Sequence, residues 1–368
     1  MSTTPPVYTP RNFSALGYAP STAERQAFRQ YLLQRYGYRL PLGSGLLVGI
    51  ILGLLFLWPI ALGGLLLSIG GVGNLIAGNL IGAVYTVVGL GMVAFGVGMT
   101  WCVIWASRRS VSTSLLTTMR LFSFARDNRF QFTPRTENPL YPGMIFNLGH
   151  GRASCDRVHS LPGQRFFDIG RMTYRTSNGK SDVTHTWGYL AFQLDRRLPH
   201  IVLDSLSNNP LWSNLPDAFN RDQRLSLEGD FDRYFTLYCP REYERDALYI
   251  LTPDVMALLI DHAAPFDVEI VDDLVFVYSA APFDHNGMNA FVRMWQVLDT
   301  VGAKTLRQTH RYADERVPDR SLNVVAPPGR RLRRSYLPAL IVGGIVLLVS
   351  VLTTIIPVVI GLIVALTS

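Results

Sequence analysis

Two long stretches without a charged side chain constrain this chain more than any other feature of its sequence. No Asp, Glu, Lys or Arg occurs from Leu40 to Ser107 or from Ser335 to Ser368. A helix needs about 20 apolar residues to cross a bilayer core, so the first stretch is long enough for two crossings and the second for one. The sequence therefore predicts an integral membrane protein and excludes an ordinary soluble enzyme.

The predicted layout alternates membrane segments with soluble ones. Residues 1–41 form a segment with a basic amphipathic helix, and 42–107 form a transmembrane hairpin with helices near 45–68 and 75–105. The turn is expected at Gly70–Asn74, where helix-breaking residues cluster. The remaining parts are a juxtamembrane amphipathic helix at 108–135, an α+β domain at 136–316, a Pro- and Arg-rich linker at 317–334 and a third transmembrane helix at 335–368.

Arginines flank the uncharged stretches, whereas the turn of the hairpin carries no charge. The flanking arginines are Arg108, Arg109, Arg330, Arg331, Arg333 and Arg334. Cytoplasmic flanks of membrane helices are enriched in Lys and Arg. We therefore expect a multi-pass protein of the cell membrane whose N-terminus and main domain are cytoplasmic and whose C-terminus is outside.

Glycines at a spacing of four mark the predicted hairpin. They are Gly45, Gly49 and Gly53 on the first helix and Gly78 and Gly82 on the second. Small residues at this spacing let helix backbones approach closely, which fits either self-association or packing of the hairpin within one chain. Ion and proton pathways need ionisable groups in the membrane, and the predicted spans have none. A transporter or channel accessory subunit is therefore only a second alternative.

Two amphipathic helices flank the hairpin. Ser21 and Glu24 fit a capping box, and an apolar stripe with arginines around it follows, as is typical of helices on a membrane surface. That stripe consists of Phe28, Tyr31, Leu32 and Tyr36. A second stripe after the hairpin consists of Leu115, Leu116, Met119 and Phe122. The second stripe fits packing on the membrane surface and packing on the cytosolic domain equally well.

The domain between the membrane segments has the pattern of an α+β fold. Strands are predicted at 166–176, 184–194, 200–204, 224–227, 234–239, 267–271 and 274–278. Hairpin turns are expected at Ser177–Lys180 and Asp272–Asp273, and helices begin at Thr252–Pro253 and cover 291–301. We expect a membrane-anchored α+β protein, with three transmembrane helices and one cytosolic antiparallel sheet that has helices on one face.

The charge and the motifs of this domain exclude several function classes. Residues 136–329 contain 19 Lys and Arg against 25 Asp and Glu, so the formal net charge of +7 of the whole chain comes from the membrane flanks. Nucleic-acid-binding domains need a basic face, which excludes nucleic acid as a partner. No P-loop, GxGxxG turn, GxSxG or HExxH motif occurs. The sequence therefore predicts no cofactor, and it shows no local metal site.

His200, Asp204 and Ser205 would carry a reaction if this protein had one. In a strand, His200 and Asp204 share a face while Ser205 points away, which disfavours a Ser-His-Asp triad. The acidic residues from Glu242 to Asp261 alternate with arginines and indicate a solvated face. A membrane-tethered hydrolase or transferase is therefore the alternative to a non-enzymatic protein.

The leading hypothesis is a membrane protein whose cytosolic domain binds a protein partner or assembles with itself. Three aromatic residues outside the periodic apolar faces are candidate contacts: Trp187, Tyr189 and Trp212. The alternative for Trp187 and Tyr189 is that they fill the core face of the sheet. The lipid bilayer is the other expected partner.

The stretch Phe231–Tyr238 and the motif Ala247–Pro253, which reads Ala-Leu-Tyr-Ile-Leu-Thr-Pro, carry a resemblance. They resemble an uncharacterised family of bacterial membrane-anchored proteins, known as a domain of unknown function. The resemblance implies an N-terminal transmembrane hairpin and a cytosolic domain, and it brings no catalytic residues to this chain. The predicted third transmembrane helix departs from that pattern.

Overall fold

The computed structural model divides the chain into two units, which are described one at a time. It describes residues 11–38, 55, 57–177, 179, 181–208, 215, 218–280, 283 and 288–335. Unit 1 comprises Met1–Pro134 and Asp284–Met288, and unit 2 comprises Arg135–Phe283 and Asn289–Ser368. The predicted third transmembrane helix at 335–368 lies outside the described residues except for Ser335.

Unit 1 contains a hairpin of two apolar helices, α3 (Trp58–Ile76) and α4 (Ile81–Asp127). By length and composition, Trp58–Ile76 and Ile81–Trp105 could cross a membrane. The predicted turn at Gly70–Asn74 was wrong, because α3 runs through it to Ile76. The chain turns at Ala77–Leu80 instead, where Gly78 takes the left-handed backbone conformation, with a φ of +81°, that glycine adopts readily.

Glycines hold the two helices of this hairpin together. A Cβ on Gly71 of α3 would lie 2.6 Å from the backbone nitrogen of Thr86, and one on Gly64 would lie 2.6 Å from the carbonyl oxygen of Gly89. Of the predicted packing glycines, Gly82 contacts α3 inside the hairpin and Gly78 is in the turn. Gly45, Gly49 and Gly53 lie outside the described residues.

Helix α4 does not end with the apolar segment. It continues to Asp127, so the helix that the sequence predicts at 108–135 is the last part of α4 rather than a separate element. The reason is local, since no Gly or Pro interrupts the sequence from Trp101 to Asn128. The backbone at Arg108 and Arg109 is helical.

Two further elements of unit 1 pack against the last part of α4. They are the 3₁₀ turn η1 (Ser14–Gly17) and helix α1 (Thr22–Tyr36). The predicted capping box is confirmed: the Glu24 amide donates to the Ser21 hydroxyl and the Ser21 amide donates to the Glu24 carboxylate. Gly37, with a φ of +61°, ends α1.

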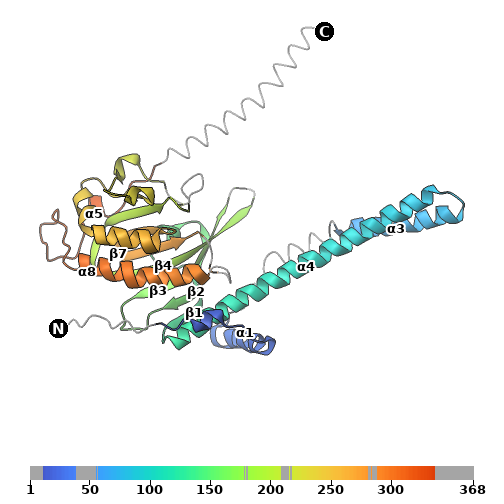
Figure 1. Ribbon diagram of the computed structural model, residues 1–368, viewed down its shortest axis with the longest axis horizontal. Coiled ribbons are helices and arrows are strands. Elements are labelled where there is room, and N and C mark those ends of the chain that lie inside the picture. Colours follow the sequence, from blue (N-terminus) through green and yellow to red (C-terminus); the bar gives the residue numbers. More distant parts are fainter. Residues whose placement is uncertain are drawn as a thin grey trace, which may run out of the picture. The chain divides into compact units, whose positions relative to one another are not determined.

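Unit 2 contains a sheet of seven strands, except that the first four residues of β1 belong to unit 1 (Figure 1). The strands are β1 (Gln131–Glu137), β2 (His150–His159), β3 (Phe167–Ser177), β4 (Asp182–Ser205), β5 (Arg224–Leu225), β6 (Phe235–Tyr238) and β7 (Asp267–Ser279). Their order is β1-β2-β3-β4-β6-β5, and β7 also pairs with β4. The pairings of β2–β3, β3–β4, β4–β6, β4–β7 and β5–β6 are all antiparallel. The predicted antiparallel sheet is thus confirmed.

The long strand β4 joins segments that the sequence analysis separates. The predicted strands 184–194 and 200–204 are its two parts, and the predicted turn at Asp272–Asp273 lies inside the single strand β7. That turn was wrong because both aspartates have partners outside their own strand. Asp272 pairs with Arg331 at 3.0 Å, and Asp273 accepts a hydrogen bond from Gln193 at 2.7 Å.

The helices of unit 2 gather over one face of the sheet (Figure 1). They are α5 (Glu244–Ile250), α6 (Pro253–Leu258), α7 (Met288–Val297) and α8 (Ala303–Thr309), with the π-helical turns η6 (Leu259–Ala263) and η7 (Leu298–Gly302). Short 3₁₀ turns lie at η3 (Met144–Asn147), η4 (Arg221–Gln223), η5 (Phe231–Arg233) and η8 (Pro327–Gly329). Trp295 of α7 meets Phe167 of the sheet edge-on, with ring centroids 4.9 Å apart.

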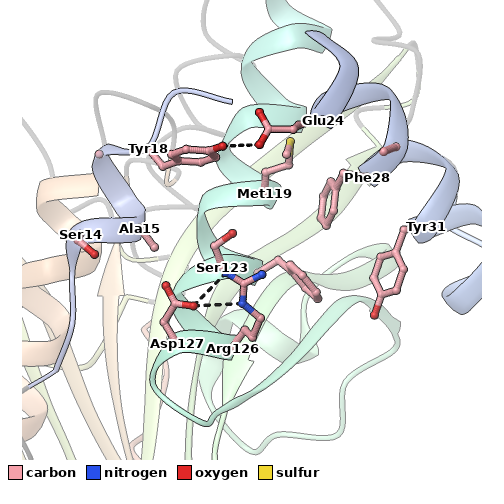
Figure 2. Close-up of a pocket in the computed structure, with 13 residues that line it drawn as sticks. Ser14, Ala15, Tyr18, Glu24, Phe28, Tyr31, Met119, Ser123, Arg126 and Asp127 are labelled. Atoms are coloured by element: carbon pink, nitrogen blue, oxygen red, sulfur yellow. Dashed lines mark hydrogen bonds and ion pairs between the residues drawn. The ribbon is translucent and has the colours of Figure 1, made fainter. Parts of the chain in front are cut away.

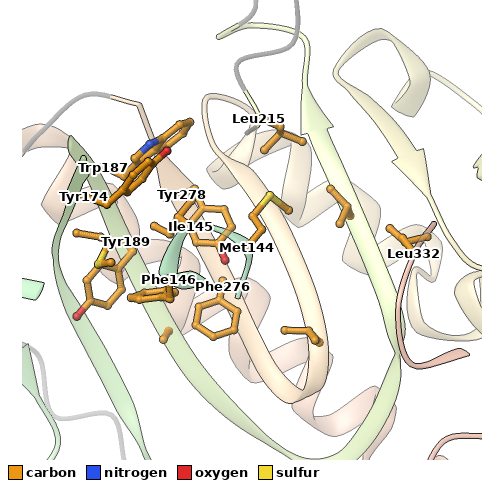
Figure 3. Packing of buried hydrophobic residues seen from close by; sticks show 14 of the residues in the cluster. Met144, Ile145, Phe146, Tyr174, Trp187, Tyr189, Leu215, Phe276, Tyr278 and Leu332 are labelled. Atoms are coloured by element: carbon orange, nitrogen blue, oxygen red, sulfur yellow. The ribbon is translucent and has the colours of Figure 1, made fainter. Parts of the chain in front are cut away.

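The other face of the sheet is covered by η3 and by the side chains of Leu215 and Leu332 (Figure 3). Trp187 and Tyr189 of β4 belong to this core and are 7% and 0% exposed. They are therefore not surface contacts, and the interpretation that they fill a core face of the sheet is the one that the structure supports. Trp212 lies outside the described residues.

Candidate functional site: a groove beside the last turns of α4

A groove of about 840 Å³ lies in unit 1 between η1, α1 and the last turns of α4 (Figure 2). Residues of all three elements line it, including Ala15 of η1, Ala27 of α1 and Ser123 of α4. Small side chains at these positions leave the space open. The groove has the concave, mostly apolar character of protein binding sites.

Aromatic side chains form one wall of the groove. Phe28 and Tyr31 of α1 lie against Phe122 of α4, with ring centroids 5.2 and 5.5 Å apart. Phe28 packs with Leu32 and Met119 in a small core of its own. The apolar stripe of α1, which we expected to lie on the membrane surface, thus packs in part against the stripe of α4.

Two tyrosines of the groove keep a large exposed area. Tyr18 is 43% exposed and Tyr31 is 39% exposed. The Tyr18 hydroxyl donates to Glu24 at 2.5 Å. This hydrogen bond raises the pKa of Tyr18 and lowers the pKa of Glu24, which also accepts hydrogen bonds from Ser21. At neutral pH the rim at this end is therefore an ionised carboxylate whose two oxygens are already engaged.

The opposite rim carries an ion pair, and hydrogen bonds hold the segment before η1 against the end of α4 beside it. Arg126 and Asp127 pair at 3.0 Å on the last turn of α4. Asn12 and Asn128 exchange two hydrogen bonds, from the Asn12 amide at 2.8 Å and from the Asn128 side chain at 2.9 Å. One rim is thus an ion pair and the other a hydrogen-bonded carboxylate, so the groove offers apolar surface with polar groups fixed at its edges.

The residues proposed for catalysis lie in unit 2 and do not form a triad. His200 donates through Nε2 to Glu269 at 2.9 Å, and its Nδ1 accepts the backbone N–H of Leu332 at 3.0 Å. Both ring nitrogens are thus occupied. The Ser205 hydroxyl bonds to the carbonyl of Ala264 instead of to His200. The carboxylate that accepts from His200 Nε2 is therefore Glu269 of β7 rather than Asp204, which is also buried. No signal in the sequence singles out Glu269.

Residues of the acidic stretch are distributed over separate ion pairs. Asp246 pairs with Arg316 at 3.0 Å and Asp254 pairs with Lys304 at 2.5 Å. Among the described residues, no group of three or more His, Cys, Asp or Glu side chains could hold a metal ion.

Comparisons with known proteins return little. No protein-family model matches the chain, and no curated protein matches it. Among solved structures, the crystal structure of the mycobacterial trehalose monomycolate transport factor A, TtfA, resembles it with 12% sequence identity and a TM-score of 0.34. That match covers 53% of this chain and 92% of the other. A TM-score of this size does not establish a shared fold.

Proposed function

We propose that this protein is an integral membrane interaction protein whose groove between η1, α1 and α4 binds an amphipathic helix of a membrane partner. The observation that carries this proposal is the position of the groove on α4, the helix that also contains the second apolar segment. The arginine flanks support a cytoplasmic location for the groove and for the sheet of unit 2.

The distance along α4 favours a protein over a lipid as the occupant. The apolar segment ends at Trp105 and the floor of the groove begins at Met119. At 1.5 Å per residue, the helix rises about 20 Å between them. The headgroup layer extends only roughly 5–7 Å beyond the hydrocarbon core, so the groove lies past the reach of the acyl chains of the bilayer.

The chemistry of the groove favours an amphipathic helix in particular. Its wall offers aromatic surface at Phe28, Tyr31 and Phe122. The charged groups of its rims already have hydrogen-bond or ion-pair partners within unit 1. Helix-in-groove complexes use apolar anchors at i, i+3 or i+4 and i+7, with polar residues on the outer face. Such a segment can bury the exposed part of Tyr18 and Tyr31 and leaves no charge of the groove without a partner.

A photo-cross-linking experiment tests the proposal. A photoreactive phenylalanine analogue replaces Tyr31 in the full chain in native membranes, and the cross-linked peptides are identified by mass spectrometry. We expect a single dominant adduct on a helical segment of another membrane protein. Amine-reactive reagents are unsuitable, because the chain has only two lysines, Lys180 and Lys304.

Two substitutions on α1 provide the matched comparison. Ala27 lines the groove and Gln30 does not, although both are exposed on the same helix. Ala27→Arg should abolish the adduct by filling the groove, and Gln30→Arg should leave it unchanged. Adducts that survive Ala27→Arg contradict the proposal. If the adduct forms on a second copy of this chain, the occupant of the groove is another copy, and the partner proposal is wrong.

The proposed sidedness has its own test. In a variant without the three native cysteines, Asn74→Cys near the end of α3 should react with an impermeant maleimide added outside the cell. Asn178→Cys, between β3 and β4 in the sequence, should react only after the membrane is permeabilised. The reverse pattern overturns the cytoplasmic placement of the sheet.

A further inference from the structure

A second recess, on unit 2, is lined by four arginines, of which three form no ion pair among the described residues. It has a volume of about 530 Å³ and lies between α5 and the chain that follows α8. Its charged lining consists of Arg245, Asp246, Arg311, Glu315, Arg316 and Arg320. Four arginines against two acids give this recess a positive balance in a domain whose overall charge is negative.

One arginine of the recess is structural. The Arg316 guanidinium lies 3.8 Å from the centre of the Tyr243 ring and pairs with Asp246 at 3.0 Å and Asp314 at 3.2 Å. Tyr312 donates to Asp246 at 2.7 Å. Asp246 and Asp314 share the single charge of Arg316, so about one negative charge remains at the base. The other three arginines outweigh that charge and the charge of Glu315.

The other three arginines point to a ligand. Arg245, Arg311 and Arg320 are exposed, and within the described part of the chain none of them forms an ion pair or a side-chain hydrogen bond. Arg311 and Arg320 belong to one segment, whereas Arg245 comes more than sixty residues earlier, so the fold brings the two segments to one recess. Guanidinium groups bind phosphate through two parallel N–H···O bonds, and several of them around one cavity suit a doubly charged group.

The remaining wall is aromatic and preorganised. Tyr249 of α5 is 42% exposed, and its hydroxyl donates to the carbonyl of Gln308 at 3.1 Å. Gln308 returns a hydrogen bond to the carbonyl of Tyr249 at 2.8 Å. This exchange fixes α5 to α8 and holds the two arginine-bearing segments at a constant separation before any ligand arrives.

We propose that the recess between α5 and the segment after α8 binds a phosphate-bearing anion through Arg245, Arg311 and Arg320. The ligand is a phosphate monoester or a diphosphate, which is either free or the headgroup of a lipid. The site is in a different unit from the groove on α4, so this inference does not depend on the proposed partner binding.

Binding of inorganic pyrophosphate tests the proposal. The full chain is reconstituted in phosphatidylcholine nanodiscs, and the affinity for pyrophosphate is measured by calorimetry at physiological ionic strength. The triple variant Arg245→Gln, Arg311→Gln and Arg320→Gln should lose at least about tenfold in affinity, since each charge-assisted hydrogen bond contributes on that scale. All three side chains are exposed, so the fold should tolerate the changes.

A control variant with three other arginine substitutions has the same net charge as the first triple variant. Arg197→Gln, Arg221→Gln and Arg224→Gln remove the same three charges from exposed positions outside the recess. This variant should bind pyrophosphate like the unmodified protein. Equal losses in the two triple variants, or no binding by the unmodified protein, overturn the proposal.

A change in the lipid composition of the nanodiscs distinguishes a free phosphate ligand from a lipid headgroup. In nanodiscs that contain phosphatidic acid, a phosphate monoester headgroup within reach of the recess should compete and lower the apparent affinity for pyrophosphate severalfold. The control triple variant should show the same competition. An affinity that is insensitive to phosphatidic acid assigns the site to a free anion.

Discussion

Replacement of Glu269 by Gln is expected to destabilise unit 2 strongly, and the geometry lets the cost be worked out. Glu269 is 1% exposed, and its carboxylate accepts three hydrogen bonds. The donors are His200 Nε2–H at 2.9 Å, the Met144 amide at 2.8 Å and the Tyr278 hydroxyl at 2.6 Å. A glutamine keeps the shape but offers one acceptor and one donor where the glutamate offers two acceptors.

Neither orientation of the new amide satisfies every group. If its oxygen faces Met144 and Tyr278, its NH₂ meets His200 Nε2, and the histidine can accept only by moving its proton to Nδ1. That proton then faces the Leu332 N–H, which loses its acceptor. If the oxygen faces His200, the NH₂ meets the Met144 N–H. In both cases one buried backbone amide loses its acceptor.

The expected loss of unfolding free energy is about 3–5 kcal/mol. The unsatisfied buried amide costs roughly 1–3 kcal/mol, and the change from a charged to a neutral acceptor weakens each remaining bond by about 1 kcal/mol. Urea unfolding of the full chain in detergent measures it, through the fluorescence of Trp187 and Trp295, both buried in unit 2. Hydrogen exchange at the Met144 and Leu332 amides shows which orientation is adopted.

The control is Glu137→Gln. Glu137 is an exposed acid paired with Arg135 at 2.5 Å, and its side chain is 62% exposed. Exposed pairs contribute about 0–1 kcal/mol, so this variant should unfold almost like the unmodified protein. A loss below about 1 kcal/mol for Glu269→Gln refutes the reasoning, because it means that the buried network is not required to hold its segments together.

Three further predictions concern the hairpin and the response to pH. Gly71→Leu should destabilise the α3–α4 hairpin by about 1–3 kcal/mol through overpacking, whereas the neighbouring Gly70→Leu, whose Cβ meets nothing within 4 Å, should not, as measured by denaturation in mixed micelles. Burial pushes the pKa of Asp314 up, but hydrogen bonds from Tyr243, from backbone amides and from Arg316 outweigh it and leave the pKa below its usual 3.8. The stabilisation from Asp314 is then present above about pH 4 and lost on stronger acidification. In Asp314→Asn, the unfolding free energy should therefore fall less steeply below pH 4. A fall as steep as in the unmodified protein contradicts this role of Asp314. Burial lowers the pKa of His159 below 6.5, so the unfolded chain takes up that proton first and stability should fall as the pH drops below 6.5, less so in His159→Gln.

Local signals in the sequence predicted several elements well. The capping box at Ser21 and Glu24 begins α1, and Thr252–Pro253 begins α6. The turn between β3 and β4 lies where Ser177–Lys180 places it. Each of these depends on residues that are neighbours in the chain, and such interactions are visible in a sequence.

The parts that failed depend on partners far away in the chain. The stripes of α1 and α4 were both recognised, but periodicity shows only that a face is apolar and not what covers it. Phe28 and Met119 pack on one another, with more than eighty residues between them. Likewise, the pairing of Asp272 with Arg331 allows a strand to continue where two adjacent aspartates predict a turn.

The candidate sites were harder to predict from the sequence than the helices and strands. The arginine recess joins Arg245 to a segment that begins at Arg311, and nothing in either stretch indicates the other. His200 was singled out from the sequence, but its partner Glu269 comes from a different strand. Spacing rules find sites whose residues share one helix or loop, and none of these sites is of that kind.

Because α4 is continuous, a tilt of its apolar segment also moves the groove at its far end. The helix extends about 33 Å from Trp105 to Asp127 at 1.5 Å per residue. A membrane helix adjusts its tilt when the bilayer thickness changes. A change in tilt of about 10° swings the far end of such a helix sideways by roughly 6 Å, about one helix radius. In the proposed membrane arrangement, the lipid composition therefore sets the sideways distance of the groove from the point where α4 leaves the bilayer.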